Sequence, residues 1–169
     1  IPTTLLAMVD ASVGGKTGIN FNGLKNEIGV FSPAEYVLIE TEFLKTLDTQ
    51  NLLSGYAEML KHGLISTTRH WAELLNFDMN HIDYKMLQTL VAESVQIKEN
   101  IVEQDPFEKG IRKALNLGHT VGHAFESLAL ETNRPVLHGY AVAWGIVCEL
   151  YFSYLKTGFP KDKLRQTIQ

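Results

Sequence analysis

The strongest constraint on the fold is a helical spacing of apolar residues that begins at Thr49 and continues almost to the last residue. Apolar side chains recur there at intervals of three and four positions, which gives each helix one buried face. Residues that begin or end helices divide the pattern into separate helices; Asp83, for example, precedes one helix and Gly158 follows another. The predicted helices span residues 49–65, 67–76, 84–104, 110–131, 138–157 and 160–169. We therefore expect a mainly α-helical domain over residues 48–169.

Residues 1–47 differ from this part because they are rich in glycine and in residues that favour strands. The segments IPTTLLAMVD, INFNG and AEYVLIE are predicted to be strands, and ASVGGKTGIN is predicted to be a loop. So few strands cannot form a sheet domain by themselves. We expect residues 1–47 to be the cut end of a preceding domain, with strands that seek partners outside it, for example in a second copy of the chain.

Composition excludes several classes of protein. Fifteen Lys and Arg against nineteen Asp and Glu leave a formal net charge of -4, so the chain has no broad basic surface for nucleic acid. No apolar run approaches the ~20 residues of a membrane span, and the first residues lack the pattern of a signal peptide. The single cysteine, Cys148, cannot form an internal disulfide, which is typical of a reducing compartment. We expect a cytoplasmic protein with neither a nucleic-acid nor a membrane partner.

The segment DASVGGKT is close to a nucleotide phosphate-binding loop, but Asp10 stands where that motif has its first glycine. A carboxylate at this position repels a triphosphate, which argues against a nucleoside triphosphate site. Gly14 and Gly15 still let backbone amides approach a ligand, Lys16 supplies a positive charge, and Asp10 can accept a hydrogen bond from a hydroxyl. The alternative interpretation is an ordinary glycine turn with a solvated lysine.

A polar stripe is predicted along the helix 110–131. Two of its histidines are four positions apart, a spacing that can direct two imidazoles toward one ion. Gly118 and Gly122 lower helix propensity, a cost better explained by close approach of a ligand or of another backbone. The alternative is a stripe that simply faces solvent, since apolar residues occupy the opposite side. The members of the stripe, spaced four, three, four and three positions apart, are Arg112, Asn116, His119, His123 and Glu126.

A third metal ligand is available from the helix 49–65, where Glu58, Lys61 and His62 share one side. An isolated Glu-x-x-Lys pair is more often a surface ion pair. His138 stands at the start of another helix. Two histidines and a glutamate with an open position are typical of a catalytic zinc site, and the nearby cations indicate an anionic ligand.

Five blocks of sequence, read in order, resemble the 3-dehydroquinate synthase family of the shikimate pathway. The blocks are IPTTLLAMVDASVGGKTGIN, GLKNEIGVF, GYAEMLKHGLI, RKALNLGHTVGHAFE and LHGYAVAWG, and together they span nearly the whole chain. Two features depart from the family pattern. Tyr140 stands where a glutamate is usual, and AFESLALETNRPVL is longer than in some relatives.

The resemblance implies a two-domain enzyme with an N-terminal dinucleotide-binding α/β domain and a C-terminal helical, metal-binding domain. Residues 1–47 then form the truncated end of the first domain, and residues 48–169 form the second domain without its C-terminal end. The active site is implied to lie between the two domains. Other implied properties are a homodimer, bound NAD and a divalent metal ion, zinc or cobalt.

The resemblance also implies roles for individual residues. The metal ligands fall on Glu58, His119 and His138. The catalytic residues are His123, Lys61, Asp10 and Lys16, with His123 as a proton-transfer residue. Contacts to the substrate, 3-deoxy-D-arabino-heptulosonate 7-phosphate, correspond to Asp10, Lys16, Lys61, Lys98, Arg112, Asn116 and His123. Contacts to NAD correspond to Thr3, Thr4, Leu6, Asp10, Lys25, Asn26, Phe43, Thr46 and Leu47.

The implied reaction oxidises one substrate carbon transiently, eliminates phosphate, reduces the carbon again and closes a ring by an intramolecular aldol step to give 3-dehydroquinate. We expect Lys61 and Arg112 to point into the cleft that holds the metal, with the Lys61 amine solvated when the cleft is empty. Three alternatives remain. The chain could belong to another sugar phosphate cyclase, to a metal-dependent polyol dehydrogenase, or, as an isolated piece, to an inactive helical metal-binding module.

Overall fold

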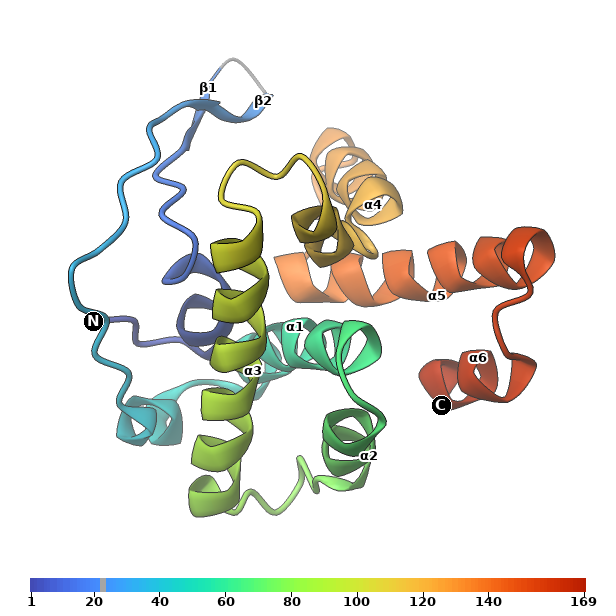
Figure 1. Cartoon of the computed structure of the whole chain (residues 1–169), viewed down its shortest axis with the longest axis horizontal. Coiled ribbons are helices and arrows are strands. Elements are labelled where there is room, and N and C mark those ends of the chain that lie inside the picture. The colour runs from blue at the N-terminus through green and yellow to red at the C-terminus, as the bar shows by residue number, and fades with distance from the viewer. Residues whose placement is uncertain (22–23) are drawn as a thin grey trace.

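The computed structural model describes residues 1–21 and 24–169, and the side chains of Asn20 and residues 24–27 also lie outside the description. Helices dominate the described chain, which confirms the expected mainly α-helical fold (Figure 1). The α-helices are α1 (Thr49–Ile65), α2 (Thr68–Asn76), α3 (Tyr84–Gln104), α4 (His119–Glu131), α5 (His138–Thr157) and α6 (Lys161–Ile168). Among the described residues, we find no helix whose length and apolar character would let it cross a membrane.

Helix α1 packs against α2, α3 and α5. It begins where the Asp48 carboxylate accepts a hydrogen bond from the Asn51 amide at 2.9 Å, as expected of an N-cap residue. Buried positions occur around most of its circumference and include the charged residues Glu58 and Lys61. Helix α5 extends beyond this group, and α6 turns back toward it (Figure 1). The position of α1 places ionised side chains inside the molecule, where they need partners.

Two apolar clusters hold the helices together. The smaller one joins α5 to α6 and consists of Val142, Ile146, Leu150 and Leu164. The larger one joins α1, α2 and α3 to the N-terminal segment, and consists of Leu5, Met8, Val9, Leu44, Leu52, Tyr56, Met59, Leu74, Leu87, Leu90 and Val91. The N-terminal segment therefore shares a core with the helices.

Two of the strands predicted in residues 1–47 are wrong. The run IPTTLLAMVD instead ends in a short π-helix, η1 (Ala7–Ala11), with Leu5, Met8 and Val9 buried. Their spacing of three and four positions from Leu5 is helical, and the unbroken apolar run obscured it. The segment AEYVLIE lies outside regular secondary structure. A 3-10 helix, η2 (Thr41–Thr46), then leads into α1.

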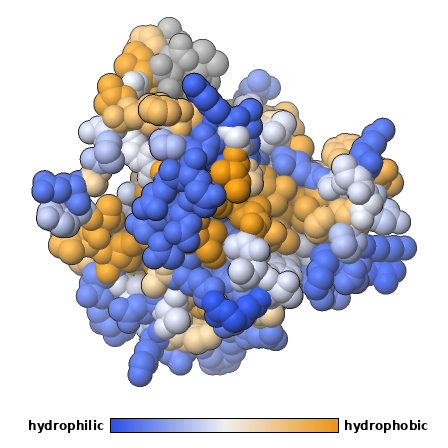
Figure 2. Space-filling view, viewed as in Figure 1, coloured by the Kyte–Doolittle hydropathy of each residue, from blue (hydrophilic) through white to orange (hydrophobic). Residues whose placement is uncertain are grey.

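The strands that form are β1 (Ile19–Phe21) and β2 (Leu24–Ile28), which pair antiparallel with Ile19 opposite Ile28. The predicted strand INFNG is therefore confirmed for its first three residues, and residues 22–23 lie outside the described chain. Figure 2 shows hydrophobic residues at the hairpin end of the molecule and along the edge near the N-terminus. Exposed apolar side chains of this part include Ile19, Phe21, Ile28, Val30, Phe31, Tyr36 and Leu38. The described part of residues 1–47 thus forms no covered sheet of its own, as expected.

The single helix predicted over residues 110–131 is also wrong. Residues Ile111–Asn116 form a 3-10 helix, η3, and α4 begins at His119. Gly118 separates the two with a φ of 81°, a left-handed conformation that glycine adopts without steric cost. The Glu149 carboxylate on α5 caps α4 by accepting hydrogen bonds from the Gly118 and Val121 amides at 2.7 and 3.1 Å. The polar stripe therefore runs over two elements with a break between them.

Candidate metal and anion-binding site

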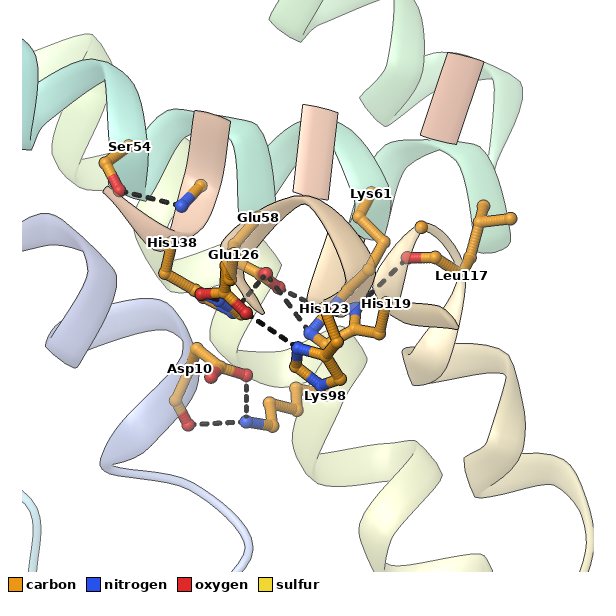
Figure 3. A network of polar contacts seen from close by, with 12 residues as sticks. Asp10, Ser54, Glu58, Lys61, Lys98, Leu117, His119, His123, Glu126 and His138 are labelled. Carbon is orange, nitrogen blue, oxygen red and sulfur yellow. Dashed lines mark hydrogen bonds and ion pairs between the residues drawn. The ribbon is translucent and has the colours of Figure 1, made fainter. Parts of the chain in front are cut away.

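Three side chains from three helices meet at one point (Figure 3). Glu58 comes from the middle of α1, His119 is the first residue of α4, and His138 is the first residue of α5. Glu58 Oε1 lies 3.6 Å from His119 Nε2 and 3.5 Å from His138 Nε2. The structure thus brings together the three residues that the resemblance implied as metal ligands.

The other nitrogen of each imidazole has an acceptor. His119 Nδ1 lies 3.2 Å from the Leu117 carbonyl oxygen, and His138 Nδ1 lies 2.9 Å from Glu126 Oε1. When Nδ1 donates its proton to such an acceptor, the lone pair of the neutral imidazole is on Nε2. In this tautomer both Nε2 atoms present a lone pair toward Glu58.

These residues fit a divalent metal ion. A tetrahedral ion held about 2.0–2.2 Å from its ligands keeps the ligand atoms about 3.4 Å apart, close to the separations found here. Glu58 Oε1 is buried and has no hydrogen-bond partner among the described residues. A buried carboxylate oxygen without a partner is costly unless a ligand satisfies it. Two imidazoles and one carboxylate form a ligand set that zinc and cobalt both accept.

The charge state of the triad depends on its neighbours. Burial alone would raise the pKa of Glu58, but the Lys61 ammonium and the imidazoles of His138 and His119 hold it well below its usual range. Burial lowers the pKa of His119, whereas contact with Glu58 and Glu126 raises the pKa of His138. Glu58 is therefore an ionised ligand, and a proton on His138 competes with a metal ion.

Lys61 is not a solvated amine, so that expectation is wrong. Its side chain is 1% exposed and its ammonium donates a hydrogen bond to Glu58 Oε2. The carboxylate needs this counter-ion because it is fully buried. His62, next along α1, is also buried, and burial together with the Lys61 charge lowers its pKa to about 3. His62 is therefore neutral, and it does not line the cavity described below.

A cavity of about 540 Å³ opens beside the triad. It contains every substrate-contact residue that the resemblance implied, including those on both sides of the broken helix. The expectation that Lys61 and Arg112 face the same cleft as the metal ligands is therefore confirmed. The lining residues are Asp10, Ala11, Val13, Lys16, Gly18, Lys61, Lys98, Glu108, Arg112, Leu115, Asn116, His119, His123 and His138.

Two pairs link the sides of this cavity. The buried Lys98 ammonium on α3 donates hydrogen bonds to the backbone carbonyl and the carboxylate of Asp10. Burial alone would raise the pKa of Asp10, but the Lys98 charge lowers it. Burial lowers the pKa of Lys98, and the Asp10 carboxylate opposes that shift. Across the mouth, Lys16 pairs with Glu108, which also accepts a hydrogen bond from the Asn116 amide at 2.6 Å.

Arg112 fixes the glycine loop. It is buried, and its guanidinium donates to the Pro106 carbonyl at 2.7 Å and to the Gly14 carbonyl at 3.2 Å. A Cβ on Gly14 would lie 2.7 Å from the Arg112 guanidinium, and the φ of Gly14 is 103°. The backbone conformation therefore favours glycine at this position, and a larger residue would also displace the end of the Arg112 side chain.

Sequence reasoning named Glu126 only as a member of the polar stripe and did not name two other glutamates of the site, Glu108 and Glu149. Glu126 Oε2 lies 2.7 Å from His123 Nδ1 while its Oε1 contacts His138, so one carboxylate orients two imidazoles. Its spacing of three positions from His123 was a usable signal. Glu108 and Glu149 gave no signal, because their partners are distant in the sequence or are backbone amides.

The residues assigned to NAD are not gathered around this cavity. Asp10 lines it, whereas Thr3, Thr4, Leu6, Phe43, Thr46 and Leu47 do not. Thr4 Oγ1 instead accepts a hydrogen bond from the Ala7 amide at 3.2 Å. Lys25 and Asn26 lie in β2, and their side chains are outside the described part. The NAD assignment stays a prediction.

Close packing of glycines sets the distance between the two histidine-bearing helices. A Cβ on Gly145 of α5 would collide with the backbone of Gly118 and Gly122, and a Cβ on Gly122 would lie 2.9 Å from the Ala141 carbonyl oxygen. The backbones of α4 and α5 are thus in direct contact. The close approach suspected from Gly118 and Gly122 is confirmed, and its partner is another backbone.

Solved structures of sugar phosphate cyclases share this fold. The 2-epi-5-epi-valiolone synthase from Streptomyces hygroscopicus subsp. jinggangensis, solved with NAD+ and Zn2+ bound, superimposes with a TM-score of 0.87 at 28% identity. The match covers 99% of this chain and 47% of that one. A 2-deoxy-scyllo-inosose synthase complexed with carbaglucose-6-phosphate, NAD+ and Co2+ gives a TM-score of 0.86 at 25% identity, over 99% and 46% of the two chains.

Sequence comparison gives higher identities. The 3-dehydroquinate synthase of Parabacteroides distasonis is 61% identical over 168 residues, which are 99% of this chain and 48% of that protein. The 3-dehydroquinate synthase of Streptococcus pyogenes serotype M18 is 43% identical over 169 residues, or 100% and 46% of the two. The chain thus spans about half the length of these curated relatives. The family model described as 3-dehydroquinate synthase N-terminal matches residues 1–54, and the one described as 3-dehydroquinate synthase C-terminal matches residues 55–169. With most of its length in that second match, this chain belongs to the 3-dehydroquinate synthase family.

Proposed function

We propose that this chain supplies the metal- and substrate-binding part of a 3-dehydroquinate synthase, which converts 3-deoxy-D-arabino-heptulosonate 7-phosphate into 3-dehydroquinate and phosphate. The observation that carries the proposal is the convergence of Glu58, His119 and His138 beside a cavity lined by four cationic side chains. A polyol dehydrogenase needs the metal ligands but has no use for so many fixed positive charges. A substrate with both a carboxylate and a phosphate needs both features.

Glu58 Oε1, His119 Nε2 and His138 Nε2 would hold the zinc or cobalt ion. When bound, the ion polarises a substrate oxygen and stabilises negative charge that develops on it. Lys61 keeps Glu58 ionised, and Glu126 keeps the His138 ring in the orientation that ligation requires. The chain thus holds its ligands in place before any ion arrives.

The remaining cavity residues bind and orient the substrate in this proposal. Lys16 and Lys98 both line the cavity and supply charge to its two anionic groups, and Asn116 donates from its amide. Arg112 keeps the glycine loop against the cavity while its guanidinium lines the wall. Asp10 accepts hydrogen bonds from substrate hydroxyls. Fixed partners hold one flexible substrate in a single reactive pose through several steps.

His123 is the proposed proton-transfer residue. Its ring lines the cavity, and Glu126 orients it through Nδ1. An imidazole can both accept and donate a proton, which is the role that this reaction requires. NAD supplies a hydride acceptor when bound, and we assign its contacts within this chain to Thr3, Thr4, Leu6, Asp10, Lys25, Asn26, Phe43, Thr46 and Leu47.

Domain organisation and assembly are part of the proposal. Residues 1–47 belong to an NAD-binding domain, and residues 48–169 belong to the helical domain. The exposed apolar side chains of residues 19–38 support a partner surface for the first part. Trp144, Tyr151 and Phe152 of α5 expose a further apolar face, which supports a homodimer that sedimentation can detect.

The direct test is a chimera in which this chain replaces the corresponding half of the Parabacteroides distasonis enzyme. With NAD and zinc, the chimera should release phosphate from 3-deoxy-D-arabino-heptulosonate 7-phosphate and yield 3-dehydroquinate. The isolated chain should release none. The same chimera given glucose 6-phosphate tests the alternative assignment to another sugar phosphate cyclase. Turnover of that sugar alone, or of neither substrate by a folded, zinc-loaded chimera, would refute the assignment to dehydroquinate synthesis.

A further inference from the structure

A second group of possible metal ligands lies away from the cavity, between α2 and α3. We call it the α2–α3 cluster; it consists of His70 and Glu73 on α2 and Glu93 on α3. One donor atom from each residue lies within 4.8 Å of the others. None of the three lines the cavity of the first site. The proposed function makes no use of them.

His70 is a buried imidazole with one satisfied nitrogen. The residue is 0% exposed, and its Nε2 lies 2.9 Å from the Ser94 hydroxyl oxygen. Its Nδ1 has no hydrogen-bond partner among the described residues and points toward the carboxylates, 3.4 Å from Glu93 Oε2. With Nε2 donating to Ser94, the Nδ1 lone pair is directed at two glutamates that have no proton to donate. The glutamates can partner this nitrogen only through a shared proton or a shared cation, and in the neutral tautomer only a cation serves.

The arrangement repeats the geometry of the first site. There, a buried oxygen without a hydrogen-bond partner lies 3.5 and 3.6 Å from imidazole nitrogens, and here a buried nitrogen without one lies 3.4 Å from a carboxylate oxygen. Both distances suit donors that share a tetrahedral ion. In each site the second imidazole nitrogen is fixed by another group, Glu126 or Leu117 in one and Ser94 in the other. Burial also lowers the pKa of His70, and the neutral form is the one that ligates.

Arg69 is the present counter-ion of the carboxylates. Its guanidinium donates to Glu73 Oε1 and Oε2 at 2.9 and 3.1 Å and also pairs with Glu93. The Arg69 side chain is 66% exposed, so it can swing into solvent without leaving an unfilled core position. Glu73 also lines a surface groove, which gives a hydrated ion a route to the carboxylates. Arg69 therefore competes with a cation for the carboxylates of this cluster.

We propose that His70 Nδ1, Glu73 and Glu93 bind a divalent cation of the zinc type, which joins α2 to α3. One imidazole and two carboxylates match the preferences of zinc, and magnesium and calcium are disfavoured because they select oxygen ligands. The site has three protein ligands and leaves a position for water. It is separate from the first site and does not depend on the reaction catalysed there.

Zinc binding to the chain tests the proposal. Equilibrium dialysis against Zn2+, followed by metal analysis, should find two zinc ions per wild-type chain. Glu58→Gln should retain one, held by the α2–α3 cluster; if this variant does not fold, His119→Ala serves the same purpose. Glu73→Gln and Glu93→Gln should each weaken the second equivalent more than about tenfold and leave the first unchanged. Both glutamates are partly exposed, so these variants test ligation without emptying the core.

Arg69→Gln separates a metal site from a purely structural ion-pair network. Removing the competing guanidinium should tighten binding of the second zinc ion severalfold, whereas an ion-pair network would only lose stability. The matched control is Asp78→Asn, which removes the exposed carboxylate next to His81 and should change neither zinc equivalent. A single zinc ion in both the wild type and Arg69→Gln, lost in Glu58→Gln, overturns the proposal. Unchanged binding in Glu73→Gln and Glu93→Gln overturns it as well.

Discussion

The two walls of the cleft are built in different ways. The helical wall carries Glu58, Lys61 and Lys98, which are buried and paired. The loop wall, residues 10–18 and 105–116, carries Lys16 and Glu108 as a partly exposed pair and is held largely through backbone carbonyls. Buried pairs fix charges in advance, whereas exposed pairs on loops can rearrange around a ligand. The helical wall thus holds its charges in fixed positions, whereas the loop wall can change shape.

The largest expected effect lies on the helical wall. In the chimera described above, Glu58→Gln should abolish zinc binding at the first site and reduce turnover by a factor on the order of 10³ or more, because metal stabilisation of charge contributes several kcal/mol. Metal analysis and phosphate release measure both effects. The control Glu131→Gln removes an exposed glutamate at the end of α4 and should change neither. Full turnover in Glu58→Gln would remove the metal from the proposed mechanism.

The next effect compares one lysine from each wall. Lys61→Met leaves the buried Glu58 carboxylate without its counter-ion and should lower the free energy of unfolding by about 3–5 kcal/mol in the absence of metal. Added zinc should recover part of this loss because it supplies positive charge to the same carboxylate. Lys16→Met, in a partly exposed pair, should cost less than about 1 kcal/mol. Denaturant unfolding of both variants measures these losses. Equal losses in the free energy of unfolding would show that the pairs on the two walls do not differ in strength.

A third prediction concerns Glu149, which caps α4 and thereby positions His119. Glu149→Ala leaves the Gly118 and Val121 amides without their acceptor and should cost about 1–3 kcal/mol of stability. Displacement of His119 should also weaken zinc binding about tenfold, as loss of an outer-shell partner does. Glu149→Gln keeps one oxygen acceptor and should show a smaller loss of both. A change in stability alone, with zinc affinity preserved, would make the cap purely structural.

The smallest effect is a local pH dependence of the loop wall. The Asp105 carboxylate accepts hydrogen bonds from the amides of Lys109, Gly110 and Arg112 at 2.9, 2.6 and 3.1 Å. Partial desolvation alone would raise the pKa of Asp105, but these hydrogen bonds lower it. A lowered carboxyl pKa stabilises the folded loop at higher pH, and this contribution is lost as the pH falls through and below the ordinary value of about 4.

Hydrogen exchange can detect this change. Protection of the Gly110 and Arg112 amides, corrected for intrinsic exchange, should fall between pH of about 5 and 3 while the amides of α1 stay protected. Asp105→Asn should remove the pH dependence. If α1 loses protection over the same range, the two walls open together and are not independent.

Local sequence signals predicted the long helices well. Helices α1, α3 and α5 have the bounds expected from the sequence, because Asp48 and Asp83 cap two of them and Gly158 ends the third. The N-terminal run was misassigned because an unbroken apolar segment does not distinguish a buried strand from a buried helix. Gly118 was accepted as an interior helix position, although a glycine with a positive φ ends a helix or starts one.

Only part of the candidate site could be predicted from the sequence. Its proposed metal ligands, Glu58, His119 and His138, were named because their residue types and the family resemblance agreed, and the structure brings the three together. The environment of Lys61 could not be predicted, since a sequence does not state how deeply a helix is buried. Glu149 was missed because its partners are backbone amides separated from it by about thirty positions. Interactions of this kind exist only once α4 and α5 are packed.

The glycine crossing of α4 and α5 has a consequence for how the family can change. Because main chain touches main chain at Gly118, Gly122 and Gly145, the separation of His119 from His138 is set without any intervening side chain. Replacement of nearby apolar residues by larger or smaller ones should therefore leave the distance between the two imidazoles unchanged. A Cβ at any of the three glycine positions, in contrast, would meet the backbone of the facing helix, so none of them can be replaced without moving the two helices apart.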